Sequence, residues 1–77
     1  MRNVTKDEQR YVVIGLKIAY YRKLKGFTQE QLAELAGISV GYLSQVEAPG
    51  MAQAVSLKTL FTIADVLGVE PSKFLEA

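Results

Sequence analysis

The chain has no cysteine and no histidine among its 77 residues. Without these side chains it cannot form disulfides, Cys- or His-based zinc sites, a Cys nucleophile or a His-based triad. An enzyme would depend on Lys, Arg, Tyr and carboxylates. The sequence shows neither a phosphate-binding glycine pattern nor a carboxylate pair spaced for shared acid–base work. We therefore expect a protein that is not an enzyme and that holds no metal or cofactor.

Long apolar runs are also missing, and none approaches the roughly 18 residues that a membrane span needs. The first eight residues are too polar for a signal peptide. We therefore expect a cytoplasmic protein without membrane contact. An apolar content of 49% with 22% charged residues is typical of a folded chain. The length predicts one small domain over residues 1–77, with residues 1–5 as a short N-terminal arm.

Basic residues gather in the first third of the chain. Residues 1–25 hold seven Lys or Arg and two acidic residues, whereas residues 26–77 hold two basic residues and six acidic ones. A basic segment is typical of a surface that faces a polyanion, but also of the solvated face of an amphipathic helix. Charge alone leaves both interpretations open, and the solvated face is the simpler one.

Capping residues and glycines divide the chain into helical segments. Residues 5–8 (TKDE) and 28–31 (TQEQ) fit the capping box, in which a Thr and an acidic or amide residue satisfy the first backbone N–H groups. We expect five helices, which run from Lys6 to before Gly26, from Thr28 to before Gly37, from Ser39 to before Pro49, from Ser56 to before Gly68, and from Pro71 to Leu75.

Apolar residues in these segments recur at spacings of three and four, and no segment alternates at period two over more than a few residues. The pattern predicts an all-α fold. Its expected core consists of Ile14, Ile18, Tyr21, Leu32, Ala33, Ala36, Leu43, Val46, Leu57, Leu60, Ile63, Ala64, Leu67, Phe74 and Leu75. The first helix carries a second apolar stripe, formed by Val13, Leu16 and Tyr20, which is wider than a surface helix needs.

The second and third helices are short and are joined through Ala36-Gly37-Ile38-Ser39. Such a tight turn forces the two helices to cross steeply, and Gly37 stands where the chain needs a positive φ. Ala33 is small where the second helix must approach the third closely. This is the helix-turn-helix pattern, whose second helix is of the type that enters a DNA major groove.

The residues around this turn resemble the phage repressor and Cro family of helix-turn-helix proteins. The matching residues are Ile18, Arg22, Gly26 to Glu30, Leu32-Ala33, Ala36 to Ser39, Tyr42 to Ser44, Glu47, Ser56-Leu57, Leu60, Ile63-Ala64, Leu67 to Val69 and Phe74. The resemblance covers roughly residues 14–75 and implies a compact five-helix, lambda-repressor-like domain. It implies a sequence-specific regulator of transcription that binds double-stranded DNA, most simply a small dimeric repressor.

The loop after Glu47 departs from the family pattern. In the family this loop is often rich in Lys or Arg and commonly touches the DNA backbone. Here residues 48–55 read APGMAQAV and carry no charge. The departure weakens the expected contact with the DNA backbone, but it does not affect the predicted fold.

The resemblance places the DNA contacts around the start of the second helix and on the exposed face of the third. The candidate residues are Lys25, Thr28, Gln29, Ser39, Val40, Gly41, Tyr42, Ser44 and Gln45. Gln29 stands at the positive end of the second helix and is expected to donate to a phosphate, the alternative being an ordinary polar residue of the first turn. Lys25 is a candidate for a longer-range phosphate contact.

On the third helix, Gln45 suits adenine, Val40 a thymine methyl group, and Ser44 a base or a phosphate. Tyr42 is expected to reach the sugar-phosphate backbone. Gly41 lowers helix stability by about 1 kcal/mol relative to Ala, and it either permits close approach to the duplex or has no role. Because this helix has no Lys or Arg for the usual contact to guanine, we expect an A/T-leaning half-site.

Arg22 and Glu47 are expected to serve the fold rather than DNA. The resemblance implies that they form an ion pair between the first and third helices. Removing either partner from such a pair leaves the other charge uncompensated.

Phe61 and Val66 lie outside the main apolar stripe of the fourth helix, and with Met51, Ala54 and Val55 they are expected to form an exposed patch. We expect this patch to serve homodimerisation, through a contact near the end of the fourth helix and the last helix, because the family binds paired half-sites, whose centres lie about 34 Å apart. The alternative function is a protein-interaction module, such as an antitoxin or a partner-controlled regulator. No small-molecule ligand is evident.

Overall fold

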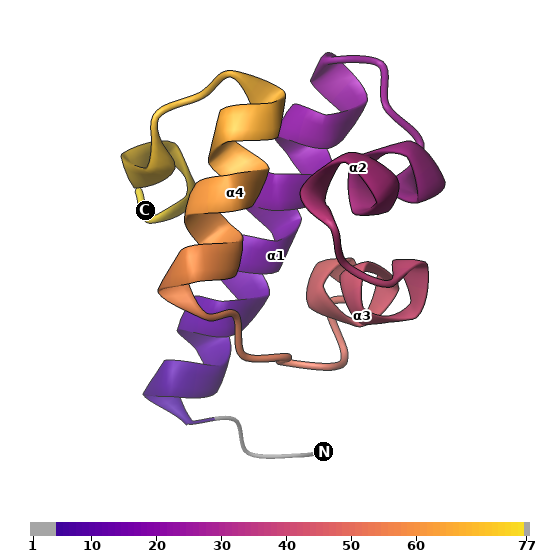
Figure 1. Ribbon diagram of the computed structural model, residues 1–77. Helices are drawn as coiled ribbons and strands as arrows, with labels where there is room; N and C mark the ends of the chain where they lie inside the picture. Colours follow the sequence, from indigo (N-terminus) through magenta and orange to yellow (C-terminus); the bar gives the residue numbers. More distant parts are fainter. Residues whose placement is uncertain (1–4, 77) are drawn as a thin grey trace.

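The computed structural model describes residues 5–76, which form four α-helices and a short 3₁₀ helix (Figure 1). The α-helices are α1 (Lys6–Leu24), α2 (Gln29–Ala36), α3 (Val40–Glu47) and α4 (Leu57–Leu67), and the 3₁₀ helix is η1 (Pro71–Phe74). In Figure 1, α2 and α3 lie to the right of α1, α4 passes in front of α1, and η1 lies to the left; α4 also packs against α2. Residues 5–76 contain no strand, so the all-α prediction is confirmed for the described chain.

The two ends of the chain differ from the sequence prediction or lie partly outside the described residues. The five-helix prediction is not confirmed, because the last segment is a 3₁₀ helix of only four residues, with Pro71 at its first position and no side-chain cap. Four residues are too few to establish the i→i+4 hydrogen bonds of an α-helix, so the segment keeps the i→i+3 bonds of a 3₁₀ helix. Of the expected N-terminal arm, residues 1–5, only Thr5 belongs to the described residues.

Each α-helix begins at its predicted cap. The side-chain oxygens of Thr5, Thr28, Ser39 and Ser56 each accept a hydrogen bond, at 3.0–3.1 Å, from the backbone N–H three residues further on. At Thr5 and Thr28 the reciprocal bond completes the capping box. These bonds satisfy N–H groups that a helix start otherwise leaves open, so local chemistry fixes where the helices begin.

The turn between α2 and α3 is as tight as the sequence predicts. Gly37 ends α2 with a φ of 69°, in the left-handed region, where a side chain would be strained. The N–H of Ile38 donates back to the carbonyl of Ala33 at 3.0 Å, which closes the helix end. Only three residues therefore separate two helices that must present different faces to the core.

One hydrophobic core joins all five elements. Its buried members are Ile18, Leu32, Ala33, Leu43, Val46, Leu60, Ile63, Ala64, Leu67 and Phe74. Tyr21 packs edge-on against Phe74, with ring centroids 5.8 Å apart, and attaches η1 to α1. Two predicted core residues are exposed instead: Leu57 (65%), the first residue of α4, and Leu75 (60%), which follows η1. Both lie at element ends, where no neighbouring element covers them.

Gly15 is a point of close approach between α1 and α3. A Cβ built at this position would lie 1.8 Å from the carbonyl oxygen of Val46 and 3.0 Å from its carbonyl carbon. Both atoms are backbone and cannot rotate away. Gly15 is therefore the residue that lets the end of α3 rest on α1.

We predict that Gly15→Ala destabilises the fold, although alanine is the better helix former. The substitution gains about 0.5–1 kcal/mol of helix propensity but causes an overlap with Val46 that costs more, so we expect a net loss of about 1–3 kcal/mol. Thermal unfolding measures the effect.

Gly41→Ala is the matched control, because a Cβ at Gly41 meets no atom within 4 Å. This substitution should raise the free energy of unfolding by about 0.5–1 kcal/mol. Equal stabilisation by both substitutions would contradict the proposed role of Gly15.

Candidate nucleic-acid interface

The recognition face is the exposed side of α3, formed by Val40, Gly41, Ser44 and Gln45. All four residues are exposed, whereas Leu43 and Val46 of the same helix are buried in the core. The apolar side of α3 thus fixes the helix to the bundle and leaves a neutral surface that combines an apolar side chain with hydrogen-bonding ones. Major-groove edges of base pairs offer the matching groups.

The first turn of α2 places two candidate residues near α3. Thr28 caps α2 by accepting from the N–H of Gln31 with its hydroxyl oxygen, and its own N–H donates to Oε1 of Gln31 at 2.8 Å. Gln29 is half-buried, and its Nε2 donates to Oε1 of Glu47 at 2.9 Å. The side chain expected to meet a phosphate is therefore already oriented by a partner within the protein.

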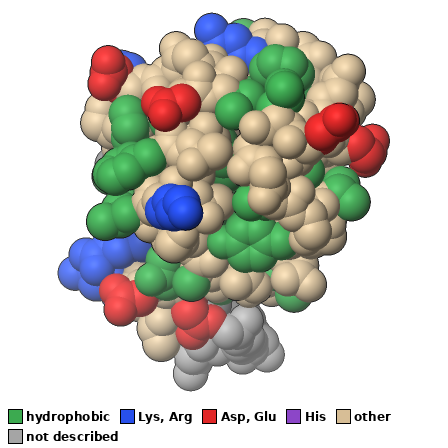
Figure 2. Space-filling view, in the orientation of Figure 1, with side chains coloured by type: hydrophobic (Ala, Val, Ile, Leu, Met, Phe, Trp, Pro, Cys, Tyr) green, Lys and Arg blue, Asp and Glu red, His purple; other side chains and the backbone are tan. Residues whose placement is uncertain are grey.

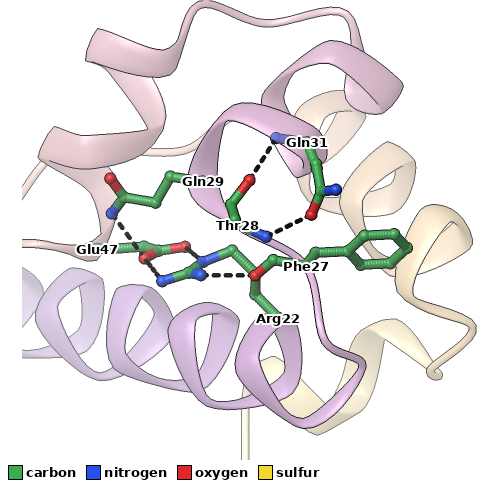
Figure 3. A network of polar contacts seen from close by, with 6 residues as sticks. All are labelled: Arg22, Phe27, Thr28, Gln29, Gln31 and Glu47. Carbon is green, nitrogen blue, oxygen red and sulfur yellow. Dashed lines mark hydrogen bonds and ion pairs between the residues drawn. The ribbon is translucent and has the colours of Figure 1, made fainter.

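Arg22 of α1 and Glu47 of α3 form a bidentate ion pair at the centre of this network (Figure 3). Arg22 donates through Nε to Oε2 at 2.8 Å and through Nη2 to Oε1 at 2.9 Å. Its Nη1 donates to the backbone carbonyl of Phe27 at 2.8 Å. The two side chains are only 9% and 4% exposed.

Every buried side-chain nitrogen and oxygen of this network has a hydrogen-bond partner. Glu47 accepts from two residues, and Arg22 also holds the carbonyl of Phe27, in the turn that leads to α2. No buried side-chain nitrogen or oxygen within residues 5–76 lacks a partner. The pair is buried and each of its polar atoms has a partner, so it links α1, α2 and α3 at this point.

Tyr42 lies differently from the expectation. It is half-buried and packs against the core, and its hydroxyl donates to the carbonyl of Ala54 at 3.1 Å. This bond ties the neutral loop, residues 48–55, to α3. Within the same loop, Ala52 has a φ of 45°, the one positive φ of a non-glycine residue in the described chain.

The remaining candidates are exposed. Ser39 caps α3 with its hydroxyl oxygen, and Lys25 lies just after α1, between that helix and α2. Neither α3 nor the loop after Glu47 adds a basic residue, so the recognition face itself carries no cation. Within residues 5–76 no group of three or more acidic side chains could hold a metal ion.

Two contacts of the site were not predicted from the sequence. The bond between Gln29 and Glu47 joins residues that are 18 positions apart, and no local pattern signals it. The contact of Gly15 with Val46 did leave a signal, because a glycine inside an otherwise apolar helix calls for a close neighbour.

The expected apolar patch is smaller than predicted. Phe61 (49%) and Met51 (51%) are exposed, as is Ala54, but Val55 and Val66 are half-buried and pack against the core. The prediction was wrong for these two valines, because Val55 of the loop and Val66 of α4 both pack against the core. Figure 2 shows hydrophobic side chains exposed over the face that carries α4.

The network gives a stability prediction for Glu47→Gln. This substitution keeps the shape of the side chain but leaves the Arg22 guanidinium buried without a counter-charge, and we expect a loss of about 3–5 kcal/mol in the free energy of unfolding, measured in urea. Glu76→Gln is the control, because its pair with Lys73 is about half exposed and should contribute less than about 1 kcal/mol. Equal effects would refute the central role of Glu47.

A family model described as helix-turn-helix matches residues 18–74. The HTH-type transcriptional regulator SinR of Bacillus subtilis is 36% identical over 64 residues, which are 83% of this chain and 57% of SinR. SlrR of the same organism is 37% identical over 65 residues, or 84% of this chain and 42% of SlrR. The chain thus spans about half the length of these relatives.

Solved structures agree with this match. The chain resembles SinR in complex with DNA with a TM-score of 0.76 and 36% identity, covering 82% of this chain and 98% of that one. It resembles the restriction-modification controller protein C.AhdI from Aeromonas hydrophila with a TM-score of 0.76 and 33% identity, covering 83% and 94%. By its sequence and by its fold, the chain belongs to the helix-turn-helix family.

Proposed function

We propose that this chain is a sequence-specific DNA-binding domain of a transcriptional regulator, most simply a repressor. The observation that carries the proposal is the two-sided character of α3. Leu43 and Val46 anchor the helix in the core, while Val40, Ser44 and Gln45 face solvent with groups that match base edges. The likeness to SinR in complex with DNA supports this use of the helix.

The exposed residues of α3 read sequence in this proposal. Gln45 makes the bidentate contact to adenine, Val40 packs on a thymine methyl group, and Ser44 bonds a base or a phosphate. The hydroxyl of Ser39 lies at the same end of the helix as Val40 and is available to a phosphate. The absence of Lys and Arg from α3 favours an A/T-leaning half-site.

Residues at the start of α2 position the domain on the DNA backbone. The amide nitrogen of Gln29 has two hydrogens, and only one is used by Glu47, so the other is available to a phosphate oxygen. Thr28 and Lys25 contact neighbouring backbone positions. Tyr42 acts by holding the loop to α3, because its hydroxyl is bonded to Ala54.

Two copies of the domain bind paired half-sites. The described chain measures 35 × 24 × 21 Å, so two domains side by side fit the spacing of about 34 Å between successive major grooves. The exposed side of α4 offers the contact, since Leu57 and Phe61 lie one turn apart and are 65% and 49% exposed. A homodimer built on these residues would leave α3 free for DNA.

Residues 5–76 act as one domain in this proposal, because a single core joins all their elements. The named relatives are transcriptional regulators and do not favour a purely protein-binding role.

Bound to DNA, the protein would work in the cytoplasm. No helix within residues 5–76 is long and apolar enough to cross a membrane.

Selection from random duplexes, sequenced after binding at two salt concentrations, tests this function. We expect one A/T-leaning palindrome, bound less tightly at higher salt. Gln45→Ala should relax the preference at one base-pair position, at a cost of about 1–3 kcal/mol, whereas Gln29→Ala should weaken all sites about equally. Binding without any motif, and no tighter than about 10⁻⁵ M, would contradict the proposal.

Sedimentation equilibrium tests the dimer contact. Phe61→Glu should shift the protein towards the monomer, because a charge in an apolar contact has no partner there. Leu35→Glu is the control, since Leu35 is 58% exposed on α2 and lies outside the proposed contact. If both variants keep the oligomeric state of the wild type, α4 is not the interface.

A further inference from the structure

Two glycines lie inside helices of this fold, and only one is explained by the protein itself. Gly15 in α1 is required because a Cβ would meet the carbonyl of Val46 at 1.8 Å. Gly41 in α3 has no such neighbour, since no atom lies within 4 Å of its Cβ position, and its φ is not positive. Alanine would fit the free protein at this position and would favour the helix.

Gly41 lies within the recognition face. It belongs to the first turn of α3, and residues with spacings of three and four, here Ser44 and Gln45, share its side of the helix. The N-terminal residues of a recognition helix are those that contact base edges. At Gly41 the main chain itself forms the surface, and the side chains of Val40 and Ser44 stand beside it.

We propose that the main chain of α3 comes into van der Waals contact with a base-pair edge at Gly41, and that a thymine methyl group occupies the place of its missing side chain. The inference rests on the proposed function, because it assumes that α3 enters the major groove. The thymine methyl group is the apolar feature of that groove, and the absence of cationic residues from α3 already disfavours guanine. The structure thereby assigns a specificity role to a residue without a side chain.

The test combines a variant that adds a side chain at residue 41 with DNA in which thymine is replaced by the smaller base uracil. Dissociation constants are measured for the wild type and for Gly41→Ala on the selected duplex, and on duplexes in which one thymine per half-site is replaced by uracil, which lacks the methyl group. Gly41→Ala should raise the melting temperature by about 3–6 °C. It should also lose about 10- to 100-fold in affinity for the selected duplex, the range of a mismatched base pair.

At one thymine position, the uracil duplex should restore most of the affinity of Gly41→Ala, while the wild type binds that duplex less tightly than the selected one. Val40→Ala is the control, because it removes a methyl contact without adding bulk and should show no such restoration at this position. The more stable variant would thus be the weaker binder, which a loss of folding could not produce.

Three outcomes overturn the inference. Gly41→Ala could bind as tightly as the wild type, its loss could be the same on every uracil duplex, or the selected half-site could lack thymine. Each of these differs from failure of the proposed function, in which the wild type itself selects no motif.

Discussion

The carboxylate of Glu47 is the group on which the arrangement of the first three helices depends. Glu47 is the last residue of α3, where the helix dipole disfavours a negative charge. Arg22 of α1 offsets this by donating two hydrogen bonds to the carboxylate, and Gln29 of α2 donates a third. An eight-residue helix is not stable alone, so α3 owes its position to this network and to its buried face.

This dependence has a consequence for the recognition face. Gln29 is bonded to the carboxylate that also holds the end of α3, so the start of α2 and the end of α3 are linked directly. The bond from Tyr42 to Ala54 links the following loop to α3 as well. In the proposed function, an interface whose parts are already ordered would lose little conformational entropy on binding, which would offset its lack of charge.

Much of the fold could be predicted because it is specified locally. The caps at Thr28 and Ser39 and the left-handed Gly37 each depend on residues within one turn, and sequence displays these directly. The exposure of Leu57 and Leu75 could not be predicted in this way. Apolar spacing identifies a helix face but does not say where the neighbouring elements end.

The candidate site was less predictable than the fold, for a physical reason. Its residues could be named from the resemblance, but the side-chain orientations follow from contacts between distant elements. Gln29 illustrates this, since its role depends on Glu47, 18 positions further on. Tyr42 illustrates it too, because its hydroxyl finds a loop carbonyl instead of solvent.

In the proposed function, the distribution of charge affects the affinity for DNA and the sequence specificity in different ways. Each phosphate that a cation neutralises adds about 0.9 to the salt slope, and neither α3 nor the loop after it contributes a cation. Lys25, which is exposed just after α1, is the one cation among the proposed contacts, so in the proposed function the salt slope would be shallow. Non-specific binding depends on the same electrostatic term and would be weak as well. In the proposed function, a neutral recognition face therefore discriminates by shape and base contacts, and paired half-sites would supply the affinity that a single face lacks.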